Sequence, residues 1–350
     1  MMPLFTKLLL LFFSFSYAVS ALADKSRFDA TKLSRVMPII AVKGNQFINE
    51  EGKTFTFRGM SIADPDKLVT EGRWNKRIFE ELASWGANTV RLPIHPVAWR
   101  KQGKEQYLAL IDEAIIWANE LNMYVIVDWH SIGYLTKGLF PKPDYETNTE
   151  ETIDFWKTIA HRYKGVSTVA LYELFNEPSN LALDVEVNWN EWKHFNEQLI
   201  DIIYDQDKQV IPLVAGFDWA YDLTPIKESP INRPGIGYVS HPYPQKAGMK
   251  QLPKRTYFDR WEKSWGYVAE KYPVVTTEIG WVKEGGFGAH IPVLNDGEYG
   301  PIIMEYLDDK GISWIGWAFD PLWSPVMIKN WDFEPSEQGK FFKKVLLEKQ

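Results

Sequence analysis

Eight short apolar segments recur along this chain, and their recurrence constrains the fold more than any other feature. They lie at residues 56–62, 88–94, 124–130, 169–178, 210–216, 237–243, 273–281 and 312–320. Because they are apolar almost throughout, they are typical of parallel strands that are buried on both faces. Segments with helical spacing separate them. In one, Ile78, Leu82 and Trp85 share a face and Gly86 ends the helix. Only the crossover after the fifth strand gives a weak helical pattern.

Eight alternations of strand and helix predict an α/β protein with a (β/α)8 barrel, the TIM barrel, rather than an open doubly wound sheet. The first strand-to-helix turn lacks the glycine pattern of dinucleotide-binding folds. Residues 42–60 alternate around the turn Asn49–Gly52, which predicts a β-hairpin ahead of the barrel. We see no linker and no second module, so we expect residues 24–350 to form a single domain.

The first 23 residues have the pattern of a secretory signal peptide. Lys7 precedes an apolar run from Leu8, and the small-x-small sequence Ala21-Leu22-Ala23 follows. The run is too short to span a membrane comfortably. We therefore expect cleavage after Ala23, a soluble protein that is secreted to the periplasm or the medium, and no membrane partner.

Composition removes several classes of function. The formal net charge is −7 and the Lys and Arg residues are scattered, which argues against a nucleic-acid partner. There is no cysteine, so disulfides, thiolate catalysis and cysteine-bound metals are excluded. The 16 Trp, 16 Tyr and 20 Phe residues either fill a large core or offer faces on which sugar rings stack, and composition does not separate these two readings.

Polar side chains gather where the predicted strands end. In a TIM barrel the carboxyl ends of the strands form the active-site face. The polar and aromatic residues at these ends are Arg91, Asp128, His130, Asn176, Glu177, His241, Tyr243, Glu278, Trp317 and Asp320. Their placement predicts an enzyme rather than a scaffold.

Several of these residues also have a structural reading. Arg91 could pair with Glu173, act in catalysis, or do both. Glu173 precedes Glu177 on the same strand face, so we expect it to point inward at a deeper level. We expect Asp128 to be structural. His130 and His241 stand outside any His-x-His or His-x-x-x-His cluster, so we predict no metal site.

Glu177 and Glu278 end the fourth and seventh strands, which lie across the barrel mouth from each other. Two facing carboxylates can divide labour, one protonating a leaving oxygen while the other attacks carbon, as glycosidic bond cleavage requires. The alternative reading is two unrelated surface carboxylates.

The motifs that hold these residues resemble those of glycoside hydrolase family 5, in the clan that carries its two catalytic glutamates on strands four and seven. They are VRLPI around Arg91, VDWH ending at His130, FNEP with Asn176 and Glu177, SHPY, TEIGW and IGWAFD. The resemblance runs from Arg58 to Trp331. It implies a retaining double displacement without metal or cofactor.

The resemblance also implies a role for each matched residue. Glu177 would be the general acid/base, and Asn176 would bind the sugar 2-hydroxyl. Glu278 would be the nucleophile, with Arg91 and Tyr243 as the donors that keep it ionised. His130 and His241 would line the site, and Trp317 would form the floor under the attacked sugar.

Family members cleave mostly β-1,4-linked polysaccharides, so we expect a monomeric endo-β-1,4-glucanase acting on a β-linked polysaccharide or oligosaccharide. A mannan- or xyloglucan-directed enzyme is the alternative. A non-catalytic glycan-binding barrel and a metal-dependent hydrolase are further readings. We expect two or three of the loop tryptophans to bind sugar, and Trp281 first among them. The set is Trp74, Trp99, Trp129, Trp219, Trp281, Trp323 and Trp331.

Overall fold

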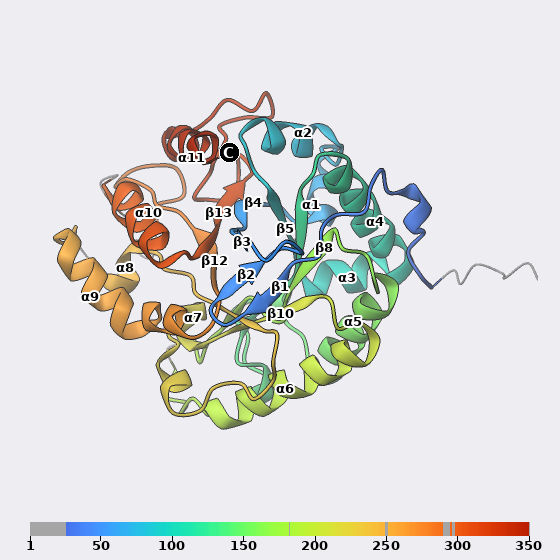
Figure 1. Cartoon of the computed structure of the whole chain (residues 1–350). Coiled ribbons are helices and arrows are strands. Elements are labelled where there is room, and N and C mark those ends of the chain that lie inside the picture. The colour runs from blue at the N-terminus through green and yellow to red at the C-terminus, as the bar shows by residue number, and fades with distance from the viewer. Residues whose placement is uncertain (1–25, 182, 249–250, 290–294, 296–297, 350) are drawn as a thin grey trace, which may run out of the picture.

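Eight parallel strands close into a barrel (Figure 1), which confirms the predicted fold. The computed structural model describes residues 26–181, 183–248, 251–289, 295 and 298–349, so the predicted leader at 1–23 lies outside the described residues. The strands follow one another around the barrel in the order β10-β11-β12-β13-β4-β5-β6-β8. Their bounds are β4 (Arg58–Ile62), β5 (Thr89–Ile94), β6 (Tyr124–Trp129), β8 (Val169–Glu173), β10 (Ile211–Ala215), β11 (Gly237–Val239), β12 (Val274–Ile279) and β13 (Ser313–Phe319).

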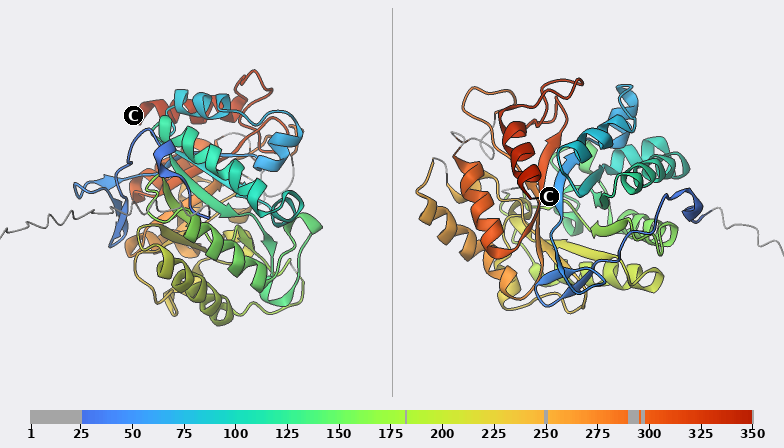
Figure 2. Two further views of the ribbon diagram at one scale, coloured as in Figure 1. Left: turned by 90° about the vertical axis from the view of Figure 1, so that its right-hand side faces the viewer. Right: turned by 45° about the horizontal axis from the view of Figure 1, so that its top comes forward.

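Helices surround the barrel on the outside (Figures 1 and 2). The long ones are α2 (Arg77–Ser84), α4 (Lys104–Glu120), α5 (Thr149–Arg162), α6 (Trp189–Gln206), α9 (Lys254–Ser264), α10 (Tyr299–Lys310) and α11 (Glu337–Glu348). Local signals set their ends: the Asn148 side chain caps α5 by accepting from Glu151 N, and left-handed Gly311 ends α10. No helix in the described part of the chain is long and apolar enough to cross a membrane.

Short helices occupy the loops. They are α1 (Pro65–Thr70), α3 (Pro96–Gln102), α7 (Phe217–Ala220) and α8 (Pro244–Ala247). The 3-10 turns are η1 (Ala30–Lys32), η2 (Leu135–Lys137), η3 (Pro143–Tyr145), η4 (Thr224–Lys227) and η5 (Gly266–Glu270). The crossover from β10 to β11 contains only α7 and η4, which explains its weak helical pattern.

A small antiparallel sheet covers the end of the barrel where the strands begin (Figure 2, left). It consists of β1 (Ala41–Lys43), β2 (Gln46–Ile48) and β3 (Thr54–Phe55). The predicted hairpin corresponds to β2 and β3, and β1 adds a third strand. Phe47 of this sheet packs edge-on against Phe57, with 5.1 Å between ring centroids. The sheet thus closes the barrel opposite the polar strand ends.

The barrel interior changes from apolar to polar along the strands. On β6, Tyr124 and Ile126 belong to the inner apolar cluster, and Asp128 follows on the same face. On β8, Leu171 belongs to that cluster and Glu173 follows two residues later. On β6 and β8, charged side chains therefore enter the interior near the carboxyl ends, where they support the site above them.

Candidate active site

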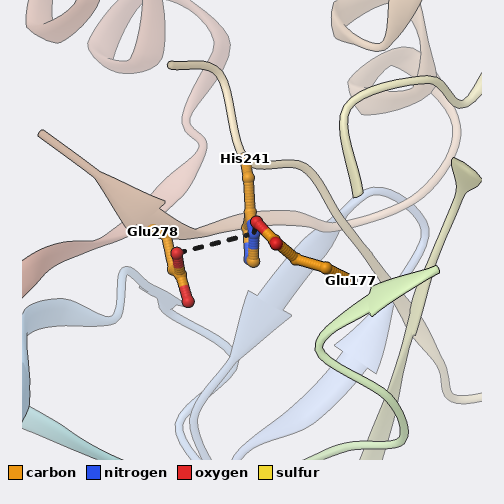
Figure 3. A group of neighbouring side chains, drawn as sticks. All are labelled: Glu177, His241 and Glu278. Atoms are coloured by element: carbon orange, nitrogen blue, oxygen red, sulfur yellow. Dashed lines mark hydrogen bonds and ion pairs between the residues drawn. The ribbon is translucent and has the colours of Figure 1, made fainter. Parts of the chain in front are cut away.

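The two predicted carboxylates meet at the mouth of the barrel. One oxygen of Glu177, one oxygen of Glu278 and a ring nitrogen of His241 all lie within 4.8 Å of one another (Figure 3). Inverting glycosidases need roughly 6.5–9.5 Å between their carboxyl groups to admit a water, whereas retaining enzymes hold them about 5–5.5 Å apart. The spacing in this chain suits the retaining arrangement.

Glu177 does not stand on a barrel strand itself. The barrel strand β8 ends at Glu173, and Glu177 lies on β9 (Glu177–Pro178), which pairs with β7 (Ile132–Gly133) from the preceding crossover. This two-stranded extension raises Glu177 above the interior carboxylate Glu173. The expected difference in depth between the two is confirmed.

Glu278 owes its direction to a β-bulge. The register between β12 and β13 shifts because one more residue separates Thr276 from Ile279 than separates Trp314 from Gly316. In a regular strand Thr277 and Glu278 would point to opposite faces. At the bulge both side chains reach the interior polar network, since the Thr277 hydroxyl donates to Glu173 (2.8 Å) and Glu278 accepts from Arg91.

A second register shift carries Trp317 into the site. It falls between Gly316 and Phe319 of β13, opposite β4. The Trp317 ring lies nearly parallel to those of His130 (5.3 Å, 6°) and Trp323 (5.7 Å, 16°). An aromatic surface thus stands beside the carboxylates.

Hydrogen-bond donors engage both oxygens of Glu278. Arg91 Nη1 donates to Oε1 (3.2 Å) and the Tyr243 hydroxyl donates to Oε2 (2.8 Å). Burial nevertheless raises the pKa of Glu278 above its ordinary value, and the charges of His241 and Arg91 and the Tyr243 hydrogen bond oppose that rise only in part. The expected donors are therefore in place, but burial outweighs them.

Glu177 has a different environment. His241 Nδ1 lies 2.9 Å from Glu177 Oε1. Glu177 Oε2 makes no hydrogen bond within the described residues, and the side chain lines the central cavity. One oxygen is thus held by the protein while the other is available to carry a proton toward a ligand.

His241 lies behind the carboxylates rather than on the cavity wall, which corrects the expectation that it lines the site. It is fully buried, and its Nε2 lies 2.9 Å from Thr277 Oγ1. Burial lowers the pKa of His241, but Glu278, Glu173 and Glu177 together raise it to about 10. Both ring nitrogens therefore act as donors, one to Glu177 and one to Thr277.

Arg91 pairs with the interior carboxylate Glu173, as one reading of the sequence expected, and it also reaches Glu278. Its Nε and Nη2 donate to the two oxygens of Glu173 (2.7 and 3.0 Å) while Nη1 reaches Glu278. Burial raises the pKa of Glu173, but the Arg91 charge and the His241 hydrogen bond outweigh this and hold it at about 2. Arg91 Nη2 also donates to Asn176 Oδ1 (2.7 Å). Asn176 Nδ2 is buried without a partner among the described residues, so a substrate hydroxyl can accept from it.

Asp128 has the structural role expected of it. Its Oδ2 accepts from His130 Nδ1 (2.7 Å) and pairs with Arg91 Nη2 (3.0 Å). Burial lowers the pKa of His130 well below its ordinary value, so this ring is neutral. The Asp128 contact fixes its tautomer and leaves Nε2 as the acceptor.

The cavity above these groups has a volume of about 440 Å³. The predicted residues on its wall are His130, Asn176, Glu177, Tyr243, Glu278 and Trp317. A larger hollow of about 670 Å³ lies elsewhere, beside α4 and α5, and none of the predicted catalytic or substrate-binding residues lines it. Chemistry rather than size therefore identifies the candidate site.

The tryptophan prediction is partly wrong. Trp219 lines the cavity and Trp323 stacks on Trp317. Trp281 is only 7% exposed and packs against Tyr299, Phe341 and Phe342, away from the cavity wall. The remaining rings contact other aromatic side chains: Trp74 with Trp117, Trp99 and Trp129 with Phe155, and Trp331 with Phe333.

The wall residues that the sequence did not indicate include Lys142, Tyr145 and Lys246. Lys142 and Tyr145 belong to the long third loop, whose length was the available signal. Lys246 follows Tyr243 by one short turn and carries no motif of its own.

Distance alone would also allow Glu177, His241 and Glu278 to bind a cation. However, His241 already donates to Glu177, and both oxygens of Glu278 accept from protein donors. A metal would have to displace these hydrogen bonds.

Comparison with known proteins agrees with this geometry. Residues 48–322 match the cellulase family, glycosyl hydrolase family 5. The crystal structure of β-glucanase SdGluc5_26A from Saccharophagus degradans in complex with cellotetraose is 56% identical, with a TM-score of 0.90, and the match covers 92% of this chain and 96% of that one. The catalytic domain of Thermobifida fusca endoglucanase Cel5A shares the fold, with a TM-score of 0.67 at 24% identity over 88% of this chain and 97% of that chain.

Among curated proteins, endoglucanase A from Butyrivibrio fibrisolvens is 26% identical over 79% of this chain. The match spans 59% of that relative and 56% of an endoglucanase from Clostridium saccharobutylicum, so it covers little more than half the length of these two relatives. The family match over most of the chain and the 56% identity to a β-glucanase establish that this protein belongs to glycoside hydrolase family 5.

Proposed function

We propose that the chain is a retaining, endo-acting β-1,4-glucanase in which Glu278 is the nucleophile and Glu177 the general acid/base. The difference in hydrogen bonding carries this assignment. Glu278 accepts from a donor at each oxygen, which suits an ionised carboxylate, whereas Glu177 keeps Oε2 free for a proton.

The reaction proceeds in two displacements at the anomeric carbon. A Glu278 oxygen attacks this carbon, the bond to the leaving oxygen breaks, and that oxygen takes the proton of Glu177. Glu177, now a carboxylate, removes a proton from water, whose oxygen attacks the same carbon and releases Glu278. Two inversions give net retention.

The preference for β-1,4-glucan draws support from the comparisons. The 56% identical relative is a β-glucanase crystallised with cellotetraose, and the two curated relatives compared above are endoglucanases. A mannan- or xyloglucan-directed enzyme is the alternative, because the catalytic pair is common to these activities.

A substrate panel tests the proposal. Mixed-linkage glucan, carboxymethylcellulose, mannan, xyloglucan and xylan are incubated with the unmutated chain and with Glu278→Gln. We expect the fastest release of reducing ends on a glucan, a mixture of product lengths typical of endo action, and loss of turnover in the variant. Faster turnover of mannan or xyloglucan would overturn the proposed specificity. A single short product would overturn endo action. Binding without turnover would favour a glycan-binding protein.

The stereochemical course tests the mechanism. Proton NMR of a cello-oligosaccharide digest should show the β-anomer of the new reducing end before mutarotation. First appearance of the α-anomer would overturn the double displacement.

Treatment with a chelator tests whether hydrolysis needs a metal. We expect an unchanged rate of hydrolysis. A loss of activity that added metal restores would favour a metal-dependent hydrolase.

A further inference from the structure

The loop that carries Trp219 into the cavity has an unusual backbone. Asp218, Trp219 and Ala220 are three consecutive non-glycine residues with positive φ angles, of 57°, 54° and 57°. Residues with a Cβ rarely adopt this left-handed conformation, and a run of them persists only where the surroundings hold it. Contacts with neighbouring residues are therefore needed to hold this backbone conformation.

Two residues that follow β11 in the sequence restrain this turn through three hydrogen bonds. The backbone N–H of His241 donates to Ala220 O (3.0 Å). The ammonium of Lys246 donates to Asp218 twice, to the carbonyl oxygen (3.0 Å) and to Oδ1 (2.7 Å). The loop after β10 is thus tied to the loop after β11.

Lys246 also contacts the indole itself. Its Nζ lies 4.4 Å from the centroid of the Trp219 ring, within the range of a cation–π interaction. The Lys246 side chain is 16% exposed, and both residues lie on the cavity wall with Glu177. One ammonium group therefore fixes the backbone of the turn and the ring that the turn presents.

The turn stands on the side of the cavity where the leaving sugar would lie. Helix α7, which contains Trp219, packs against β9, which begins with Glu177. In the proposed reaction Glu177 protonates the leaving oxygen, so a ring presented beside it faces the departing part of the chain.

We propose that Lys246 is a positioning residue: together with Asp218 it holds the left-handed turn so that the Trp219 indole forms the platform for the sugar on the leaving-group side. This inference rests on the proposed function. A positioning role differs from direct binding of substrate by Lys246, because Lys246 would then act only through Trp219.

A double-mutant cycle separates these two possibilities. We expect Lys246→Met to lower kcat/KM for cello-oligosaccharides about tenfold, and Lys246→Arg to retain most of the activity because it keeps the charge. In a Trp219→Ala background, Lys246→Met should have little further effect, less than about twofold. An activated aryl cellobioside, whose leaving group is no sugar, should lose far less in Lys246→Met than the oligosaccharides do.

Lys227→Met is the matched control. Lys227 lies 4.3 Å from the Tyr267 ring centroid, the same kind of contact on an exposed face away from the cavity, and its loss should leave kcat/KM unchanged. Thermal unfolding of every variant verifies that it is folded.

The inference would be overturned if Lys246→Met lowered kcat/KM equally in the presence and absence of Trp219. It would also be overturned if Lys246→Met did not lower kcat/KM at all. If the unmutated chain hydrolyses β-glucan but Lys246→Met loses as much kcat/KM without Trp219 as with it, this inference fails and the proposed function stands. If the unmutated chain hydrolysed no β-glycan, the proposed function would fail and the inference with it.

Discussion

At the scale of single residues, the two proposed catalytic carboxylates have the same chemistry but different surroundings. Glu278 is buried and accepts from Arg91 and Tyr243, so each of its oxygens already has a donor. Glu177 accepts from His241 at one oxygen and faces the cavity with the other. These surroundings suit Glu278 to the role of charged nucleophile and Glu177 to that of proton carrier in the proposed mechanism.

Replacing Glu177 tests the proton-carrier role. Glu177→Ala should lower kcat/KM on cello-oligosaccharides about 10³-fold, since a sugar alkoxide leaves poorly without a proton. Aryl glycosides with acidic leaving groups need little protonation and should lose much less. The measurement is kcat/KM across a series of leaving groups. Equal losses along the series would contradict the assignment.

Replacing Tyr243 tests the environment of the nucleophile. The Tyr243 hydrogen bond lowers the pKa of Glu278, which burial has already raised. Tyr243→Phe removes the donor, so the pKa rises further and Glu278 is protonated at a higher pH. Because attack requires the charged form, the acid limb of the kcat/KM profile should move to higher pH.

Tyr267→Phe serves as the control, because its hydroxyl donates to Leu223 O away from the site. An acid limb that stayed in place or moved to lower pH in Tyr243→Phe would contradict the proposed role of this hydrogen bond.

At the scale of elements, the strands could be predicted from sequence but their irregularities could not. A strand buried on both faces is apolar throughout, so its pattern does not reveal an extra residue. The bulge that turns Glu278 inward therefore left no signal. Nor did the left-handed turn at residues 218–220, because it contains no glycine.

The ion pair between β5 and β8 joins elements that lie 82 residues apart in the sequence. Removing one partner of a buried pair leaves the other charge without compensation. Glu173→Gln should therefore lower the free energy of unfolding by about 3–5 kcal/mol, as measured by urea denaturation. Asp201→Asn, which breaks the exposed pair with Arg233, should cost no more than about 1 kcal/mol. Similar losses in both variants would contradict the structural importance of the interior network.

At the scale of the whole molecule, the position of the site followed from the topology. The carboxyl ends of parallel strands converge, so residues from the ends of the predicted second, third, fourth, sixth, seventh and eighth strands could be assigned to one place before any coordinates. The expectation that Trp281 binds sugar was wrong because topology does not determine how a side chain packs. Its ring is covered by α10 and α11, and a Cβ on Gly300 would come within 2.4 Å of it. Packing of this kind depends on side chains far along the chain, which local patterns do not register.

The most direct test of the account is to identify the residue that bonds to the sugar. A 2-deoxy-2-fluoro cellobioside with an activated leaving group slows the second displacement, so the glycosyl-enzyme accumulates and can be digested for peptide mass spectrometry. The proposed mechanism predicts a single fluoroglycosyl label on Glu278, formed more slowly in Tyr243→Phe. A label on Glu177, or turnover of this compound without any labelled peptide, would contradict it.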